Sequence, residues 1–166
     1  MDLLKGLKRT HSCGVLTNAN KDEEVILCGW VSRRRDHGGL IFVDLRDRSG
    51  MVQVVFSSEM HQEVFTKAES IRSEFVLAVK GVVKTRAAET VNPKMATGEI
   101  EVYCNELRIL NKAKTPPFYI QDDIDTDENL RLKYRYLDLR RPEMQKNLIL
   151  RHKVTMAMRR YFDEQG

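Results

Sequence analysis

The 166-residue sequence has no long apolar run, and none of its apolar stretches approaches the roughly 18 residues of a membrane span. The N-terminal apolar stretch is also too short for a signal peptide. Only three cysteines are present, an odd number at wide spacing, which excludes a disulfide framework or a zinc knuckle. These absences predict a protein of a reducing compartment, the cytoplasm, with no membrane partner.

Catalytic signatures are missing as well. The sequence contains no glycine-rich phosphate loop, no cluster of metal-ligand residues and no nucleophile elbow. Nothing in it predicts a catalytic centre, so we expect no catalytic residue, no metal and no cofactor in this chain. What remains to be explained is binding.

Charge is unevenly distributed along the chain. The hydrophobic fraction is 42%, the charged fraction 31% and the net charge +4, all compatible with a folded domain. Residues 131–160 contain ten Lys and Arg against only Asp138 and Glu143, whereas the preceding residues 121–128 are strongly acidic. This asymmetry indicates either an anionic partner or two segments that fold on each other.

Residues 1–110 are dominated by alternating patterns typical of strands. A helix is predicted between the third and fourth strands, with Val64, Phe65, Ala68 and Ile71 at helical spacing, and Gly81 is a candidate bulge. This order is that of the five-stranded barrel called the OB-fold, so the predicted fold class is mostly β. The expected strands cover 24–31, 40–47, 51–56, 75–86 and 98–110, and the helix covers 61–74. The tight-turn dipeptide Ser49–Gly50 predicts that the second and third strands form a hairpin.

Beyond the barrel we expect a hinge over 111–141, with two prolines and a short helix at 130–140. A last helix is predicted over 142–166, because Pro142 suits a first helical turn and apolar residues recur at helical spacing. These apolar residues are Leu150, Val154, Met158 and Tyr161. An apolar stripe needs a covering surface, so we interpret this helix as the start of a second domain.

One strand places an aromatic residue on its polar side. In residues 40–47, Ile41 and Val43 fall on the core face, while Phe42 and Asp44 fall on the outward face. The same alternation turns Gln53 outward on the next strand. On the last strand, Ile100, Val102 and Cys104 face inward, and Glu99, Glu101 and Tyr103 face outward.

This outward face combines a stacking ring with an amide, carboxylates and the arginines of 33–35. Such a set suits an unstacked base, with arginine contacts to phosphates. Plainer interpretations stay open. Phe42 could pack under a loop, the arginine run could be a solvated strand end, Gln53 could be an ordinary exposed residue, and His37 could be a turn residue.

Three blocks, 28–56, 92–102 and 130–154, resemble the bacterial-type aspartyl-tRNA synthetases. The resemblance implies an N-terminal OB-fold that grips the tRNA anticodon, a hinge, and a class II catalytic domain that uses ATP and Mg²⁺. It also implies a homodimeric parent enzyme. The chain stops within the first class II motif, and the second and third motifs are absent. The resemblance therefore implies a ligase as the parent, and an inactive piece.

Carried over by position, Phe42 matches the aromatic that stacks on the central anticodon uridine. Arg35 and Gln53 match residues near the central and third bases, and Asn92 and Glu101 match residues near the first two. Arg33 belongs to the arginine run expected at the RNA.

His37 matches a position where family members that also charge asparagine tRNA tend to carry His, and strict members Leu. The anticodons GUC and GUU differ only in the third base, and imidazole can face either a donor or an acceptor edge. The expected partners are therefore tRNA-Asp and, on this one residue, tRNA-Asn.

Three other readings remain. An asparaginyl- or lysyl-tRNA synthetase has the same barrel and hinge, although blocks 33–39 and 95–102 argue against both. A free-standing single-strand binding module would not expose the stripe of the last helix. A scaffold barrel that binds proteins would not bind RNA in a salt-dependent way.

Overall fold

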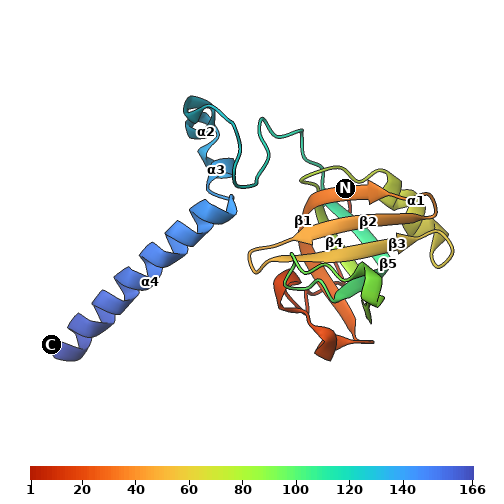
Figure 1. The fold of residues 1–166 in the computed structure, drawn as a ribbon, viewed down its shortest axis with the longest axis horizontal. Helices are drawn as coiled ribbons and strands as arrows, with labels where there is room; N and C mark the ends of the chain where they lie inside the picture. The colour runs from red at the N-terminus through yellow and green to blue at the C-terminus, as the bar shows by residue number, and fades with distance from the viewer. The chain divides into compact units, whose positions relative to one another are not determined.

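The computed structural model describes residues 1–166 and divides them into two compact units, Met1–Thr115 and Pro116–Gly166. The first unit is a closed barrel of five strands in the order β1-β2-β3-β5-β4 (Figure 1). The strands are β1 (Glu24–Asp36), β2 (Leu40–Arg46), β3 (Met51–Ser57), β4 (Val76–Thr85) and β5 (Ile100–Asn111). All pairs are antiparallel except β3 with β5, which confirms the predicted OB-fold.

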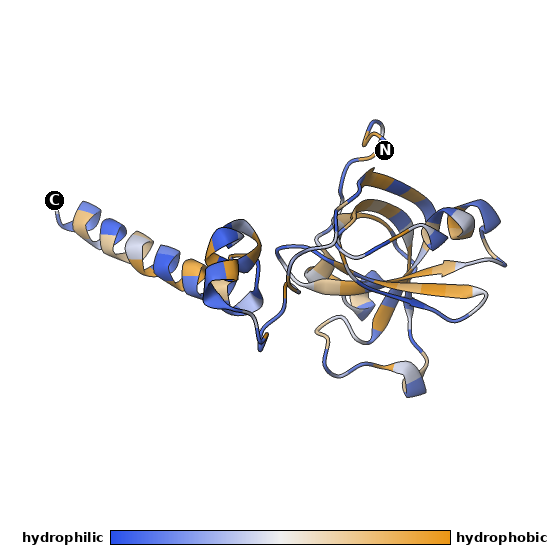
Figure 2. Cartoon of the chain, turned by 90° about the horizontal axis from the view of Figure 1, so that it is seen from above, coloured by the Kyte–Doolittle hydropathy of each residue, from blue (hydrophilic) through white to orange (hydrophobic).

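Apolar residues of alternate positions fill the barrel. Ile41, Val43 and Leu45 of β2 are fully buried, as the strand alternation predicted, and Ile100, Val102 and Cys104 of β5 are buried too. Figure 2 shows the resulting mixture of apolar and hydrophilic bands along the strands. Burying this set is the main source of the barrel's stability.

Helix α1 (Gln62–Glu69) lies between β3 and β4 in the chain and contributes Phe65 and Ala68 to the core. It is shorter than the predicted 61–74, because Ser70 ends it, yet Ile71 just beyond it is still fully buried. Short 3-10 turns η1 (Cys13–Val15), η2 (Asn18–Asn20) and η3 (Ala88–Thr90) complete the unit.

Two tight connections shape the strand ends. Between β2 and β3 the chain turns from Asp47 to Gly50, with the Asp47 N–H donating to the Gly50 carbonyl at 2.9 Å, which confirms the predicted hairpin. Between β1 and β2 the turn holds His37, whose N–H donates to the Leu40 carbonyl, and Gly38 with φ +76°. Glycine adopts that backbone conformation without strain.

Gly81 marks a close approach of strands. A Cβ there would lie 2.3 Å from the Tyr103 carbonyl oxygen, so only glycine fits. The predicted bulge is found at this point, but the unpaired residue is Asn105 on β5, because Lys80 pairs with Glu106 and Gly81 with Cys104.

The second unit contains α2 (Glu128–Lys133), α3 (Arg135–Asp138) and α4 (Pro142–Gln165). The short helix predicted over 130–140 is two helices, separated at Tyr134, where φ −108° and ψ 45° interrupt the helical backbone. Helix α4 starts with Pro142 in its first turn, as predicted, and its stripe of Leu150, Val154, Met158 and Tyr161 is exposed. None of the helices is long and apolar enough to cross a membrane.

Candidate nucleic-acid interface

A bulge in β1 decides where the arginines point. Val31 pairs with Leu45, but the next pair is Arg33 with Asp44, so Ser32 is skipped. Without the skip, Arg33 and Arg35 would share the inward face with the buried Val31. The bulge moves both arginines to the outward face, which is the usual effect of one extra residue in a strand.

The register then aligns two rows of outward side chains across the sheet. One row runs from Arg35 on β1 to Phe42 on β2, Val55 on β3 and Tyr103 on β5. The neighbouring row begins with Arg33, Asp44 and Gln53, which are paired opposite one another. Directly opposed residues share a face, so the predicted outward set is a single surface.

A cavity of about 490 Å³ opens on this surface. Five of the residues predicted to bind RNA line it: Arg35, His37, Phe42, Gln53 and Asn92. Three more complete the wall and were not foreseen: Leu40, Arg86 and Thr90. The loop after β4, which brings Arg86, Thr90 and Asn92, therefore forms one side of the cavity.

The wall is aromatic at Phe42. Its ring is half-buried and meets the His37 ring edge to face, with centroids 5.5 Å apart and planes at 81°. His37 is thus more than a turn residue in this structure, because it lies against the ring that is expected to stack on a base.

Polar side chains form a continuous chain of hydrogen bonds. Arg35 Nη2 donates to Asp44 Oδ1 at 2.7 Å and to Gln53 Oε1 at 3.1 Å. Gln53 Nε2 donates in turn to Glu101 Oε2 at 2.9 Å. Gln53 is only 7% exposed, so it faces outward as predicted but lies covered rather than open to solvent.

Arg86 adds a buried cation at the far end of this chain. Its Nε donates to the Ile100 carbonyl at 2.9 Å and lies 3.8 Å from Glu101 Oε2. Burial lowers the pKa of the Arg86 guanidinium, while the negative charges of Glu101 and Asp44 oppose that shift.

Two guanidinium groups belong to this wall, those of Arg35 and Arg86. The Arg35 side chain is the more accessible of the two, 35% exposed against 4% for Arg86. A guanidinium carries only donors, so the wall suits a ligand that offers hydrogen-bond acceptors.

Family models match both parts of the chain. Residues 25–110 match the model described as OB-fold nucleic acid binding domain, and residues 127–166 match that of the class II tRNA synthetases (D, K and N). The chain belongs to the OB-fold nucleic acid binding domain family. This membership agrees with a surface that offers an aromatic ring and guanidinium groups.

Two relatives extend that assignment. The chain is 61% identical over its whole length to an aspartate–tRNA(Asp/Asn) ligase of Heliobacterium modesticaldum, and 63% identical over 96% of its length to that of Symbiobacterium thermophilum. It spans only 27% of the length of either relative. The resemblance to aspartyl-tRNA synthetases, first drawn from three sequence blocks, is confirmed.

Solved structures show the same OB-fold. Asparaginyl-tRNA synthetase from Pyrococcus horikoshii aligns with a TM-score of 0.80 and 25% identity, over 96% of this chain and 35% of that one. The structure of an OBody bound to hen egg-white lysozyme aligns with a TM-score of 0.57 and 29% identity, over 64% of this chain and 96% of that one.

Two predicted residues of this OB-fold domain do not line the cavity. Arg33 is exposed on β1 beside it, and Glu101 lies below Gln53 with its side chain 14% exposed. Burial, followed by the negative charge of Glu101, raises the pKa of the neighbouring Tyr103 hydroxyl.

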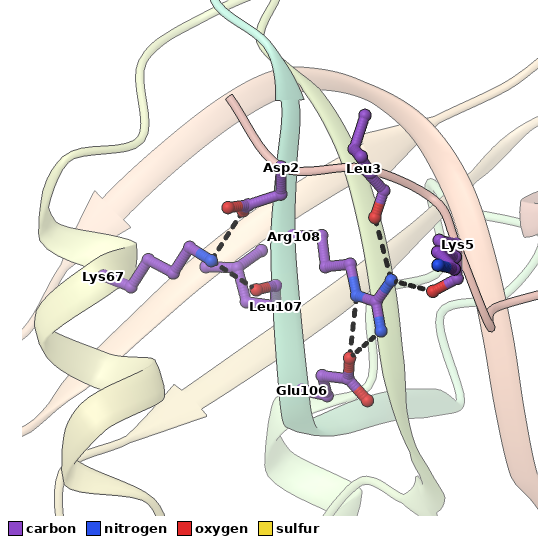
Figure 3. Close-up of a pocket in the computed structure, with 7 residues that line it drawn as sticks. All are labelled: Asp2, Leu3, Lys5, Lys67, Glu106, Leu107 and Arg108. Carbon is purple, nitrogen blue, oxygen red and sulfur yellow. Dashed lines mark hydrogen bonds and ion pairs between the residues drawn. The ribbon is translucent and has the colours of Figure 1, made fainter.

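A second hollow on the OB-fold domain, of about 550 Å³, is lined by charged side chains that are paired with partners inside the domain (Figure 3). Lys67 Nζ contacts Asp2 Oδ2 at 2.6 Å and donates to the Leu107 carbonyl, and it holds the pKa of Asp2 below its usual value. Arg108 donates to Glu106 and to the carbonyls of Leu3 and Lys5. These charges satisfy one another and fasten the N-terminal segment to β5, so we interpret this hollow as structural.

The charge asymmetry of residues 121–160 is partly internal to the second unit. Asp138 is fully buried and contacts Arg131, Arg135 and Arg141. Asp122 of the acidic stretch accepts from the Glu143 N–H at 3.1 Å and lies 3.8 Å from Arg141 Nη1. Acidic and basic segments do therefore contact each other, one of the two interpretations drawn from the sequence.

Proposed function

We propose that this domain binds the anticodon loop of a tRNA, with one unstacked base lying on the Phe42 ring. The observation that carries the proposal is the cavity whose wall joins this ring to the guanidinium groups of Arg35 and Arg86. Single-stranded bases are held by aromatic stacking together with hydrogen bonds to their edges.

The chemistry of the wall favours a base over an apolar ligand. Carbonyl oxygens and ring nitrogens of bases are acceptors, which suit Arg35 and Arg86, while the Gln53 amide can both donate and accept. Arg33, exposed beside the cavity, suits a backbone phosphate. Thr90 and Asn92 line the same cavity as further polar contacts.

The proposal for the whole protein comes from its relatives. As their names state, they are aspartate–tRNA(Asp/Asn) ligases, and this chain corresponds to about a quarter of each. The proposed whole protein attaches aspartate to tRNA-Asp and tRNA-Asn in the cytoplasm, as a homodimer that uses ATP and Mg²⁺. Residues 1–110 are the anticodon-binding domain, 111–141 the hinge and 142–166 the first helix of the catalytic domain.

The residues of this chain do not themselves fit a metal. No three His, Cys, Asp or Glu side chains among residues 1–166 gather so that they could hold a metal ion. In the proposed ligase, ATP and Mg²⁺ act in the catalytic domain, to which this chain contributes α4. The exposed stripe of α4 is then covered by the rest of that domain.

The test is a titration of this chain with anticodon stem-loops carrying GUC or GUU, beside a stem-loop with an unrelated loop sequence. We expect both cognate loops to bind more tightly than the control, and affinity to fall with salt. Aspartate-dependent pyrophosphate exchange should be absent. Equal binding of all three loops would refute anticodon recognition. Measurable exchange would refute the proposal that aspartate activation takes place in the rest of the protein.

A protein-binding barrel is the second candidate. An OBody of the same OB-fold is bound to lysozyme in its solved structure, so this fold can present a protein-binding face. That function becomes the better explanation if RNA affinity is weak and indifferent to loop sequence.

A further inference from the structure

The hydrogen-bond chain behind the cavity has a fixed direction. It runs from Asp44 through Arg35 and Gln53 to Glu101, at 2.7, 3.1 and 2.9 Å. Arginine can only donate, and an ionised carboxylate can only accept. The Gln53 amide therefore has one permitted orientation, with its oxygen toward Arg35 and its nitrogen toward Glu101.

Asp44 holds the other end of this chain. It is directly opposite Gln53 in the β2–β3 pairing, and its side chain is 13% exposed. Asp44 Oδ1 and Gln53 Oε1 accept from the same nitrogen, since Arg35 Nη2 donates to both. The carboxylate therefore holds the end of the Arg35 guanidinium in place in the cavity wall.

We infer that Asp44 is a positioning residue for base discrimination: it holds the Arg35 guanidinium in one orientation beside the Gln53 amide, so that a base edge meets one fixed pattern of donors and acceptors. The inference rests on the proposed anticodon binding. Asp44 itself is absent from the cavity wall, so its effect passes through Arg35.

Replacing Asp44 by Asn separates orientation from shape. Asn has nearly the same size, but its neutral amide is a weaker acceptor than a carboxylate and can turn its nitrogen instead of its oxygen toward Arg35. The Arg35 guanidinium then loses its fixed contact, while the Gln53 amide still donates to Glu101. Arg35 also loses a compensating negative charge and becomes a stronger, less selective phosphate contact.

The test compares affinity ratios. Stem-loops with GUC and with single changes at the central or third base are titrated against the wild-type chain, Asp44→Asn, Asp44→Glu and Glu24→Gln. Glu24→Gln is the matched control, because it removes one negative charge from a surface pair with Lys80 outside the cavity. Ratios between loops are unaffected by a partly unfolded sample, since the folded fraction scales every apparent affinity equally.

We expect Asp44→Asn to reduce discrimination at the central base by about tenfold or more, mainly by tighter binding of the mismatched loops. Asp44→Glu, which keeps the charge, should keep more of the discrimination, and Glu24→Gln should keep all of it. If Asp44→Asn weakens all loops equally, the affinity ratios stay the same and the Asp44–Arg35 pair has only a structural role. If Asp44→Asn changes no affinity, Asp44 has no positioning role. Either result overturns the inference. If the wild-type chain fails to prefer GUC over an unrelated loop, the proposed function falls and the inference falls with it.

Discussion

The Phe42 ring can be tested apart from the rest of the cavity. Phe42→Ala removes the aromatic face and leaves the polar chain behind it intact, because Arg35, Gln53 and Glu101 bond to one another rather than to the ring. Base–aromatic stacking contributes about 1–3 kcal/mol. The dissociation constant for a GUC stem-loop should therefore rise by about 5- to 150-fold.

The effect on stability should be much smaller than for a core aromatic. Phe42 is half-buried on the outward face and is not part of the core cluster, whereas Phe56 on the neighbouring strand is fully buried within it. Phe56→Ala should cost about 3–5 kcal/mol of unfolding free energy. Phe42→Ala should cost less than half of that, which paired thermal melts would show.

Two further substitutions distinguish stacking from packing. Phe42→Tyr keeps a ring and should retain most of the affinity, while Phe42→Leu keeps apolar volume without a π-face and should bind nearly as weakly as Phe42→Ala. The assay is a fluorescence anisotropy titration of a labelled stem-loop at one salt concentration, since salt shifts every RNA affinity. Leucine at position 42 with wild-type affinity would show that the ring only fills space, and the stacking argument would be wrong.

Three other predictions follow from single contacts. His37 contacts the Phe42 ring, so the dissociation constants of GUC and GUU loops for the wild-type chain should agree within about tenfold, or 1.4 kcal/mol. His37→Leu should increase the difference between the two constants by weakening GUU. An unchanged ratio in parallel titrations would mean that His37 is only a turn residue. Burial alone would raise the pKa of Asp47, but hydrogen bonds from Ser49 and the Cys13 N–H outweigh it and lower that pKa. The stabilisation is therefore present above about pH 4 and is lost as the pH falls through the lowered value. Chemical denaturation at several pH values should show the difference in unfolding free energy between the wild-type chain and Asp47→Asn shrinking as the pH falls below about 4. Gly81→Ala should lower the unfolding free energy of the barrel by about 1–3 kcal/mol or more, because the new Cβ would lie 2.3 Å from the Tyr103 carbonyl oxygen. An unchanged melting temperature would contradict that geometry.

The sequence predicts the barrel well because its signals are local. Alternation in residues 40–47 and 98–110 placed the core and outward residues of β2 and β5 on their correct faces. The Ser49–Gly50 dipeptide located a hairpin, and Pro142 located the start of α4. Each of these signals depends on a few neighbouring residues, and period-2 burial follows from strand geometry alone.

The rest of the cavity depends on contacts that are distant in sequence. The bulge at Ser32 lies in a polar run with no alternation to read, so nothing local showed that Arg33 and Arg35 change face. Arg86 looked like a charged strand end, yet its side chain is only 4% exposed, because the loop after β4 covers it and Glu101 lies beside it. Gln53 is buried for the same reason, since its neighbours come from three other strands.

Stability and recognition occupy opposite faces of the same strands. In β2, Ile41, Val43 and Leu45 fill the core, while Phe42 and Asp44 face the cavity side of the sheet. Because the faces alternate residue by residue, a change at Phe42 or Asp44 removes no core contact, and the barrel can keep its fold while its recognition chemistry varies. The bulge at Ser32 extends this arrangement to β1, where Val31 is in the core and Arg33, past the bulge, is not. The separation explains why affinity ratios, rather than melting temperatures, are the measurements that test how this surface discriminates between bases.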